Sequence, residues 1–176
     1  MLFKLLLMVI QGGILGIVAL SKFIGLIKTS TLSKKEEANP PIENRKWLAY
    51  VNDTEYDYER AFIEHGYAYI NPKNRRINVG DTVYLYIASE KRVKYDTMVI
   101  EIDVKRRDNN YWRVVPPKGA ACKLEKIGEY KGKALSLSKL KKNGFNGEKT
   151  IKLPICNNAE LLDYIEDKFE DMYYGG

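Results

Sequence analysis

The sequence has few of the residues on which metal-binding and disulfide chemistry depend. Its 176 residues include only two cysteines, Cys122 and Cys156, and one histidine, His65. Two cysteines are too few for a disulfide framework, and neither belongs to a CxxC pair or lies near the histidine, so a zinc site is disfavoured as well. We therefore expect two reduced thiols and neither a metal nor another cofactor.

Catalytic motifs are equally scarce. The chain has no HExxH motif, no phosphate-binding loop and no Ser-His-Asp order, and His65 directly precedes Gly66, as is typical of a helix end. Alternating carboxylates at residues 53–59 lack the glycine and the final glutamate of a calcium loop. The sequence predicts a protein that is not an enzyme.

Acidic residues are absent from residues 1–35, which carry five lysines. The formal charge of the whole chain is +6, so the remainder is nearly neutral at +1. With 45% hydrophobic and 11% aromatic residues in the whole chain, that remainder is rich enough to form a packed core. We expect one globular domain preceded by a short extra segment.

The extra segment is a long apolar run at residues 2–27 within a predicted hydrophobic helix at 1–28. About 20 such residues span a bilayer, and the lysines that follow outnumber the positive charges before the run. This favours a transmembrane anchor with the domain in the cytoplasm. A cleaved signal peptide is the alternative, which would leave the mature protein exported, or cytoplasmic if the segment is simply removed.

Residues 29–44 have the composition of a linker, so the domain is expected at residues 45–176. Alternation and turn residues predict strands at 45–52, 82–89, 92–104, 111–115 and 123–130, a short extended piece at 150–153, and helices at 58–65, after Ser136 or Ser138, and at 159–173. A hairpin should join 82–89 to 92–104. Short strands with peripheral helices indicate an α+β fold built on a small mixed β-barrel.

Basic residues gather in the middle of this domain. Residues 73–152 hold 20 basic and 9 acidic side chains, whereas the flanks 36–72 and 153–176 each have a net charge of −5. The clusters lie at residues 73–76, 91–94 and 105–113, the last with Lys105, Arg106, Arg107 and Arg113. Segregation of this kind is typical of a surface that attracts phosphates.

The order of several motifs resembles the EVE domain, a member of the PUA-like superfamily related to YTH and ASCH domains. The resemblance covers about residues 45–173. It rests on KWLAYVND, YERAFIEHG, INVGDTVYLYIAS, KRVKYDTMVIEIDV, LSLSKLKKNGFNG and the final ELLDYIEDKFE. It implies a PUA-like barrel that binds nucleic acid without catalysis, with a flipped and often modified base held in an aromatic pocket between the early strands.

The resemblance also implies which residues read the base. Motif positions carry over Trp47, Asn52 and Tyr86, with Tyr69 in place of a tryptophan of the family and Ser89 beside the position of a small hydroxyl residue. The expected phosphate contacts are Lys73, Arg75, Arg76, Lys91, Arg92 and Lys94.

The leading hypothesis is a membrane-tethered sensor of a base in DNA, modified or plain, with RNA as the other possible ligand and a nuclease or helicase as a possible partner. The alternative is a membrane-anchored protein-interaction module, in which the acidic last helix docks a partner. An open aromatic pocket favours the first hypothesis, and a filled one favours the second.

Overall fold

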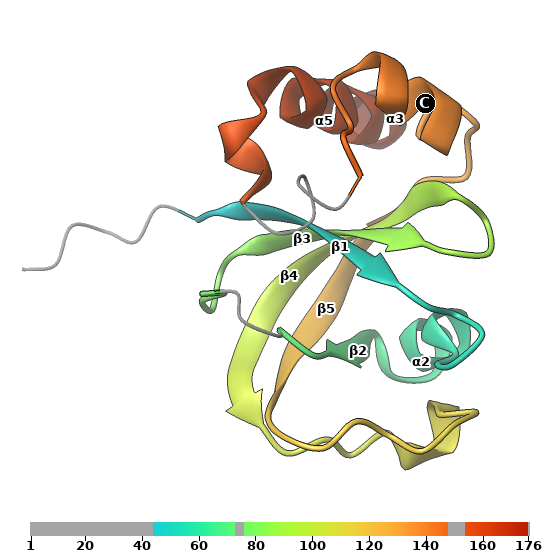
Figure 1. Cartoon of the computed structure of the whole chain (residues 1–176), viewed down its shortest axis with the longest axis vertical. Coiled ribbons are helices and arrows are strands. Elements are labelled where there is room, and N and C mark those ends of the chain that lie inside the picture. Colours follow the sequence, from blue (N-terminus) through green and yellow to red (C-terminus); the bar gives the residue numbers. More distant parts are fainter. Residues whose placement is uncertain (1–43, 73–75, 148–153, 176) are drawn as a thin grey trace, which may run out of the picture. The chain divides into compact units, whose positions relative to one another are not determined.

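The computed structural model describes residues 44–72, 76–147 and 154–175. Within these residues five strands form one mixed sheet in the order β1-β3-β4-β5-β2, in which only the β1–β3 pair is parallel (Figure 1). The strands are β1 (Lys46–Val51), β2 (Tyr67–Ile70), β3 (Thr82–Ile87), β4 (Arg92–Val104) and β5 (Ala121–Glu129). The α+β class expected from the sequence is confirmed.

The helices begin and end at or near the residues that the sequence indicated. They are α2 (Tyr58–His65), α3 (Leu137–Lys142) and α5 (Ala159–Tyr174), with the 3₁₀ turns η1 (Asn109–Tyr111) and η2 (Ile155–Asn157) between them. Asp57 caps α2 by accepting a hydrogen bond from the backbone of Arg60 at 3.1 Å. Gly66 ends the same helix in the left-handed conformation, at φ +74°, where a side chain would be strained.

The predicted hairpin is also present: β3 and β4 pair antiparallel, and Ile87 lies opposite Arg92. Strand β4 has register shifts after Asp96 and Val99, where extra residues bend a strand and increase its twist. The bend is visible in the long β4 and β5 ribbons of Figure 1. The sheet is therefore curved and has a concave face.

Side-chain alternation separates two hydrophobic cores. The first core lies on the concave face, takes residues from all five strands, and is covered by Ala61 and Phe62 of α2. The second core lies on the opposite face, where Leu48, Tyr84, Tyr86 and Val93 meet side chains of α3, η2 and α5. Figure 1 shows α3 and α5 together on that side, and α2 near β2 at the other.

The two edge strands, β1 and β2, lie at opposite ends of the pairing order. Among the described residues no strand pairing joins them, so the barrel expected from the sequence is not closed by hydrogen bonds there. A seam remains between these edges on the concave side. The candidate site lies in this seam.

One predicted strand is wrong. Residues 111–115 were expected to be extended, but Tyr111 ends η1 and Trp112 forms only an isolated bridge with Tyr56. Strands β4 and β5 already pair on both of their edges, and the segment that connects them docks on the loop after β1 without pairing, within the described residues, to the free edge of β1 or β2. Strand β2, to which the sequence reading assigned no element, occupies the free edge of β5 instead.

Some expectations fall on residues that the structure does not describe. The hydrophobic helix at 1–28, the linker at 29–44 except for Asn44, and the extended piece at 150–153 lie outside the described residues. Among the helices that are described, none combines the length and the apolar character needed to span a bilayer. The membrane anchor remains a prediction.

Candidate functional site

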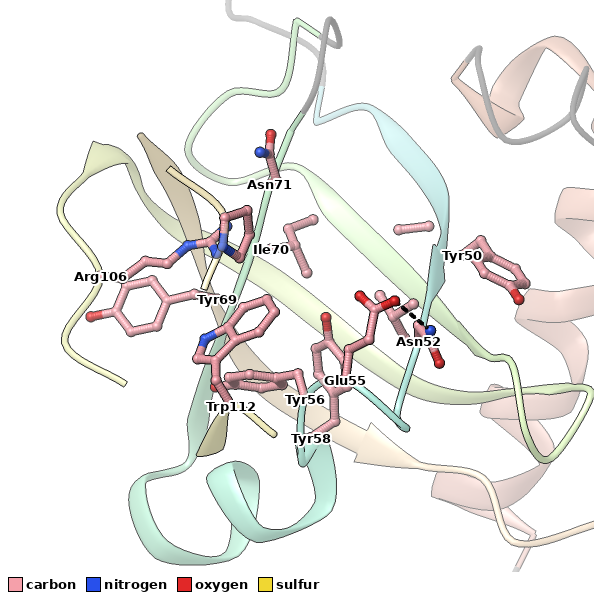
Figure 2. Close-up of a pocket in the computed structure, with 13 residues that line it drawn as sticks. Tyr50, Asn52, Glu55, Tyr56, Tyr58, Tyr69, Ile70, Asn71, Arg106 and Trp112 are labelled. Atoms are coloured by element: carbon pink, nitrogen blue, oxygen red, sulfur yellow. Dashed lines mark hydrogen bonds between the residues drawn. The ribbon is translucent and has the colours of Figure 1, made fainter. Parts of the chain in front are cut away.

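A pocket of about 410 Å³ opens in the seam between β1 and β2 (Figure 2). Its volume is within the range of small-ligand sites, roughly 300 to 1,000 Å³. We call it the seam pocket, and its lining residues are Ala49, Tyr50, Val51, Asn52, Glu55, Tyr56, Tyr58, Tyr69, Ile70, Asn71, Arg106, Trp112 and Pro117. They come from the end of β1, the loop that follows it, the start of α2, the end of β2, and the β4–β5 connection at residues 105–120.

Backbone hydrogen bonds fasten the β4–β5 connection to the loop after β1. The Asp57 amide donates to the Tyr111 carbonyl and the Arg113 amide donates to the Glu55 carbonyl, both at 2.9 Å. An ion pair of 2.9 Å between Arg113 and Asp57 strengthens the same junction. These contacts bring Trp112, which is distant in sequence, against Tyr56.

Aromatic rings form one wall of the seam pocket. The Tyr56 ring lies 4.5 Å from that of Tyr58 and 4.9 Å from that of Trp112, both at steep interplanar angles. Figure 2 shows these three side chains next to one another, with Tyr50 turned away from them. Tyr56 and Tyr58 are buried and Trp112 is half-buried, so Trp112 offers the most accessible of these three rings for stacking.

Polar atoms without partners lie among these rings. Of the five buried side-chain nitrogen and oxygen atoms that lack a hydrogen bond within the described residues, four belong to Tyr56, Arg106 and Asp108. Buried polar groups are nearly always hydrogen-bonded, and leaving one unpaired costs roughly 1 to 3 kcal/mol. These atoms are available to exchange hydrogen bonds with a bound ligand or with water.

Charge at this polar end is mixed. The Arg106 guanidinium lies 5.1 Å from the Trp112 ring, and the Trp112 indole donates to the second oxygen of Asp108 at 3.3 Å. Burial, with the nearby Asp108 carboxylate, raises the pKa of Tyr56 far above its ordinary range, although the two oxygens do not meet hydrogen-bond geometry. The lining thus offers donors from Arg106 and Tyr56, and Asp108, which is not itself a lining residue, adds an acceptor beside Trp112; this set suits a neutral polar ring edge.

The mouth of the pocket is shaped by Asn52. Its side-chain amide donates to Glu55 at 2.8 Å, and its side-chain oxygen accepts from the hydroxyl of Thr54 at 2.8 Å (Figure 2 shows the bond to Glu55). Its backbone carbonyl also accepts from the amides of Glu55 and Tyr56 at 3.2 Å. Asn52 therefore fixes the turn that presents Tyr56.

Exposed cations flank the pocket in the chain. Lys105 and Arg107 adjoin Arg106, and Lys118 follows Pro117; all three are exposed and form no ion pair within the described residues. Asp108 is the one acidic residue of this connection and is buried. The connection therefore presents uncompensated positive charge beside the aromatic wall.

Two of the five residues expected to read a base line the seam pocket: Asn52 and Tyr69. Trp47 does not, because it is buried in the first core with its indole donating to Asp81 at 2.8 Å. That bond ties the first strand to the turn before β3. Substitution of Trp47 is expected to affect folding rather than binding.

Tyr86 and Ser89 also lie outside the pocket lining. Tyr86 is on the opposite face of the sheet, where its ring stacks on that of Phe145 at 6.0 Å. Ser89 lies in the β3–β4 turn and hydrogen-bonds Asp53 through both its amide and its hydroxyl. These placements follow from strand alternation and turn geometry, which a motif position does not reveal.

The expected phosphate contacts are dispersed. Lys73 and Arg75 lie outside the described residues, while Arg76 and Lys91 are exposed. Arg92 donates to Glu90 at 2.7 Å and to the Gly132 carbonyl at 3.1 Å.

Lys94 is 7% exposed and pairs with Glu90, Glu59 and Glu129 at 2.8, 3.2 and 3.9 Å. Three carboxylates compensate its charge. Lys94 is therefore engaged in an ion-pair network and does not present a free cation to phosphate.

The residues that the sequence reading missed are Tyr56, Tyr58, Asp108, Trp112 and Pro117, together with a pocket role for Arg106. A usable signal existed in the stretch from Lys105 to Arg113, where four cations accompany Tyr111 and Trp112 in a connection between two strands. Connections on a rigid scaffold often carry binding residues. The sequence predicted a basic cluster and a strand in this stretch, but not its place beside β1.

Groups of three or more histidine, cysteine or carboxylate side chains that could hold a metal ion do not occur in the described part of the chain. The thiol of Cys122 is buried, which raises its pKa to about 11. A thiolate is therefore not available at neutral pH.

Comparison with known proteins identifies likeness in structure alone. No family model and no curated protein sequence matches the chain. A hypothetical protein from Leishmania major superposes with a TM-score of 0.51 at 14% identity, covering 73% of this chain and 96% of that one. A mutant form of the ZmASCH protein from Zymomonas mobilis superposes with a TM-score of 0.44 at 9% identity, covering 70% and 96%. At 14% identity the likeness to the Leishmania major protein concerns the fold alone.

Proposed function

We propose that this domain is a non-enzymatic nucleic-acid-binding module that takes one unstacked base into the seam pocket. DNA is the first candidate ligand and RNA the second. The observation that carries the proposal is the combination of an open aromatic pocket with unpartnered polar atoms at one end and exposed cations beside it. A base needs a ring to stack on and partners for its polar edge, and its backbone needs cations. The resemblance to the EVE domain supports the same ligand class.

Each component has a defined role in this proposal. Trp112 stacks on the base, and Arg106 and Tyr56 donate hydrogen bonds to acceptors on its edge while the free oxygen of Asp108 accepts from an amino or ring N–H group. Lys105, Arg107 and Lys118 contact phosphates. Removal of a base from its stack costs a few kcal/mol, and aromatic stacking returns about 1 to 3 kcal/mol per base.

A binding panel tests the proposal. The full-length protein, kept in detergent, is titrated at low salt with labelled oligonucleotides: single- and double-stranded DNA, plain or with a modified cytosine or adenine, and RNA of the same sequence. We expect binding that weakens as salt rises, and a preference for at least one strand form or base. Absence of binding to every probe at low salt would show the proposal to be wrong.

The acidic face of α5 favours a second candidate, a protein-docking module. Five carboxylate residues of this helix are exposed: Glu160, Asp163, Asp167, Glu170 and Asp171. They lie on the face of α5 that points away from the second core. Reversal of Asp163 and Asp167 to lysine should leave oligonucleotide binding intact under the first proposal, whereas the docking function would lose its charge complementarity.

Attachment to a membrane is a further part of the proposal and rests on the apolar residues 2–27. Fractionation of cells that express the full chain, or a chain shortened to begin after Lys35, tests it. An anchored protein pellets with membranes only when the segment is present, and a cleaved signal would instead give a soluble, shortened product from the full chain.

A further inference from the structure

The β4–β5 connection leaves the body of the domain between two residues of the seam pocket. Trp112 and Pro117 both line the pocket, while Val114 and Val115 between them are 47% and 88% exposed. No large hydrophobic side chain in the described residues is more exposed than Val115. Single exposed hydrophobic residues are ordinary on protein surfaces, so the exposure gains meaning only from the place of Val115 beside the pocket.

The protrusion, residues 113–117, is tied to the domain at its amino-terminal end and stiffened by prolines at the other. On its amino-terminal side Arg113 is bound through its amide to Glu55 and through its guanidinium to Asp57, each at 2.9 Å. On its other side Val115 precedes Pro116 and Pro117, and proline restricts both its own φ and the conformation of the residue before it. Little ordering is needed for Val115 to enter a contact, which favours binding.

The surroundings of the protrusion are cationic. Arg113 and Lys118, on either side of the two valines and prolines, are exposed, and so are Lys105 and Arg107 at the start of the same connection. An apolar tip within a positively charged rim matches duplex DNA, in which apolar stacked bases lie between two phosphate backbones. The valines would contact the bases and the cations would contact the phosphates. A hydrophobic protein groove would not require the surrounding cations.

We propose that Val115 is a wedge that enters the base stack of duplex DNA at the position that a base has left for the seam pocket. This inference rests on the proposed function of the pocket. A flipped base leaves a gap between its former neighbours, and apolar side chains inserted between base steps hold such gaps open. The wedge must lie next to the pocket that receives the base, and the chain places Val115 two residues before the pocket residue Pro117.

The experiment compares Val115→Ser with Val79→Ser in the full-length protein. Val79 is 56% exposed in the turn before β3. The register places the start of β3 beside Lys46 at the start of β1, whereas the pocket takes residues from the end of β1, so Val79 controls for loss of an exposed valine. Each variant is titrated with a DNA duplex and with the single strand of the same sequence. We expect Val115→Ser to weaken binding to the duplex by about tenfold, which corresponds to about 1.4 kcal/mol, and to leave binding to the single strand unchanged.

The remaining outcomes separate the wedge from the pocket. Equal loss on duplex and single strand would make Val115 an ordinary contact, and no loss on either would remove it from the interface; both results overturn the wedge. Binding of the wild type to single strands but not to duplex overturns the wedge and leaves the pocket standing. Binding to neither probe overturns both. Thermal unfolding of the two variants should match the wild type, because both valines are exposed.

Discussion

The two faces of the sheet carry similar aromatic residues in different chemical situations. Opposite the pocket, the Tyr84 hydroxyl donates to Glu166 at 3.3 Å and the Tyr164 hydroxyl donates to the Ala134 carbonyl at 2.8 Å. On the pocket side, the hydroxyl of Tyr56 is buried without a partner among the described residues. Whether a tyrosine hydroxyl already has a hydrogen-bond partner distinguishes packing residues from binding residues better than the number of aromatic residues does. A hydroxyl that is already paired has no hydrogen bond left to give to a ligand.

Charge also differs between one element on each side, although α3 on the side of α5 is itself basic, with Lys139, Lys141 and Lys142. The face covered by α3 and α5 ends in the acidic surface of α5, whereas the pocket side is bordered by the basic β4–β5 connection. The segregation seen along the sequence is therefore kept in space for these two elements. Four predictions test the contrast between the faces, from the largest expected effect to the smallest.

Phe169→Ala should have the largest effect, on stability. Phe169 is 2% exposed in the second core and stacks on Tyr84 at 5.6 Å, and removal of such a ring costs about 3 to 5 kcal/mol. Denaturant unfolding measures the loss, with Tyr174→Ala as an exposed control in the same helix. The folded fraction should bind oligonucleotide as the wild type does, and a specific loss of binding would contradict the division between faces.

Trp112→Ala should weaken binding more than stability, the reverse of Phe169→Ala. We expect it to weaken oligonucleotide binding by roughly 5- to 150-fold, the equivalent of losing one stacked base, with a much smaller change in unfolding free energy than Phe169→Ala causes. Fluorescence anisotropy measures the affinity. Trp112→Phe retains a ring and should restore part of it, whereas unaltered binding by the alanine variant would remove Trp112 from the site.

Lys105→Ala and Lys118→Ala should each lower affinity almost equally for all sequences. If each lysine neutralises one phosphate, the slope of log affinity against log salt should decrease by about 1 per substitution. Lys141→Ala in α3 is the matched control on the other face and should leave the slope unchanged. An equal change in the control would mean that the positive charge acts without regard to the face on which it lies.

Asp57→Asn should have the smallest effect, on the pH dependence of stability. Burial raises the pKa of Asp57, but hydrogen bonds from the Arg60 amide and from Arg113 outweigh it and lower the pKa below its ordinary value of 3.8. The carboxylate therefore stabilises the fold above pH 3.8, and this contribution is lost as the pH falls below that value.

The asparagine variant keeps the helix cap but does not titrate, so it should lose less stability between about pH 6 and about pH 3 than the wild type. The difference should be within about 1 kcal/mol, as is usual for a surface ion pair. Unfolding curves at the two pH values measure it. Identical pH dependence of both proteins would show that the junction between Asp57 and Arg113 contributes no measurable stability.

The sequence by itself determined the local structure where local chemistry dominates. Asp57 and Gly66 marked the ends of α2, and the alternation of β-forming residues on both sides of a turn marked the β3–β4 hairpin. Caps, turns and alternation act within a few residues, so they can be predicted from the residues alone. The unequal distribution of charge could also be read directly from the chain.

Only the tertiary structure decided which aromatic residues line the seam pocket. Trp47 and Trp112 are both tryptophans near basic residues, but one completes the first core through Asp81 and the other borders an opening. The seam exists because β1 and β2 do not pair with each other. The pocket forms because the β4–β5 connection, which is distant in sequence, docks on the loop after β1. Contacts across such sequence separations depend on how the sheet curves, a global property that no motif, composition or period encodes.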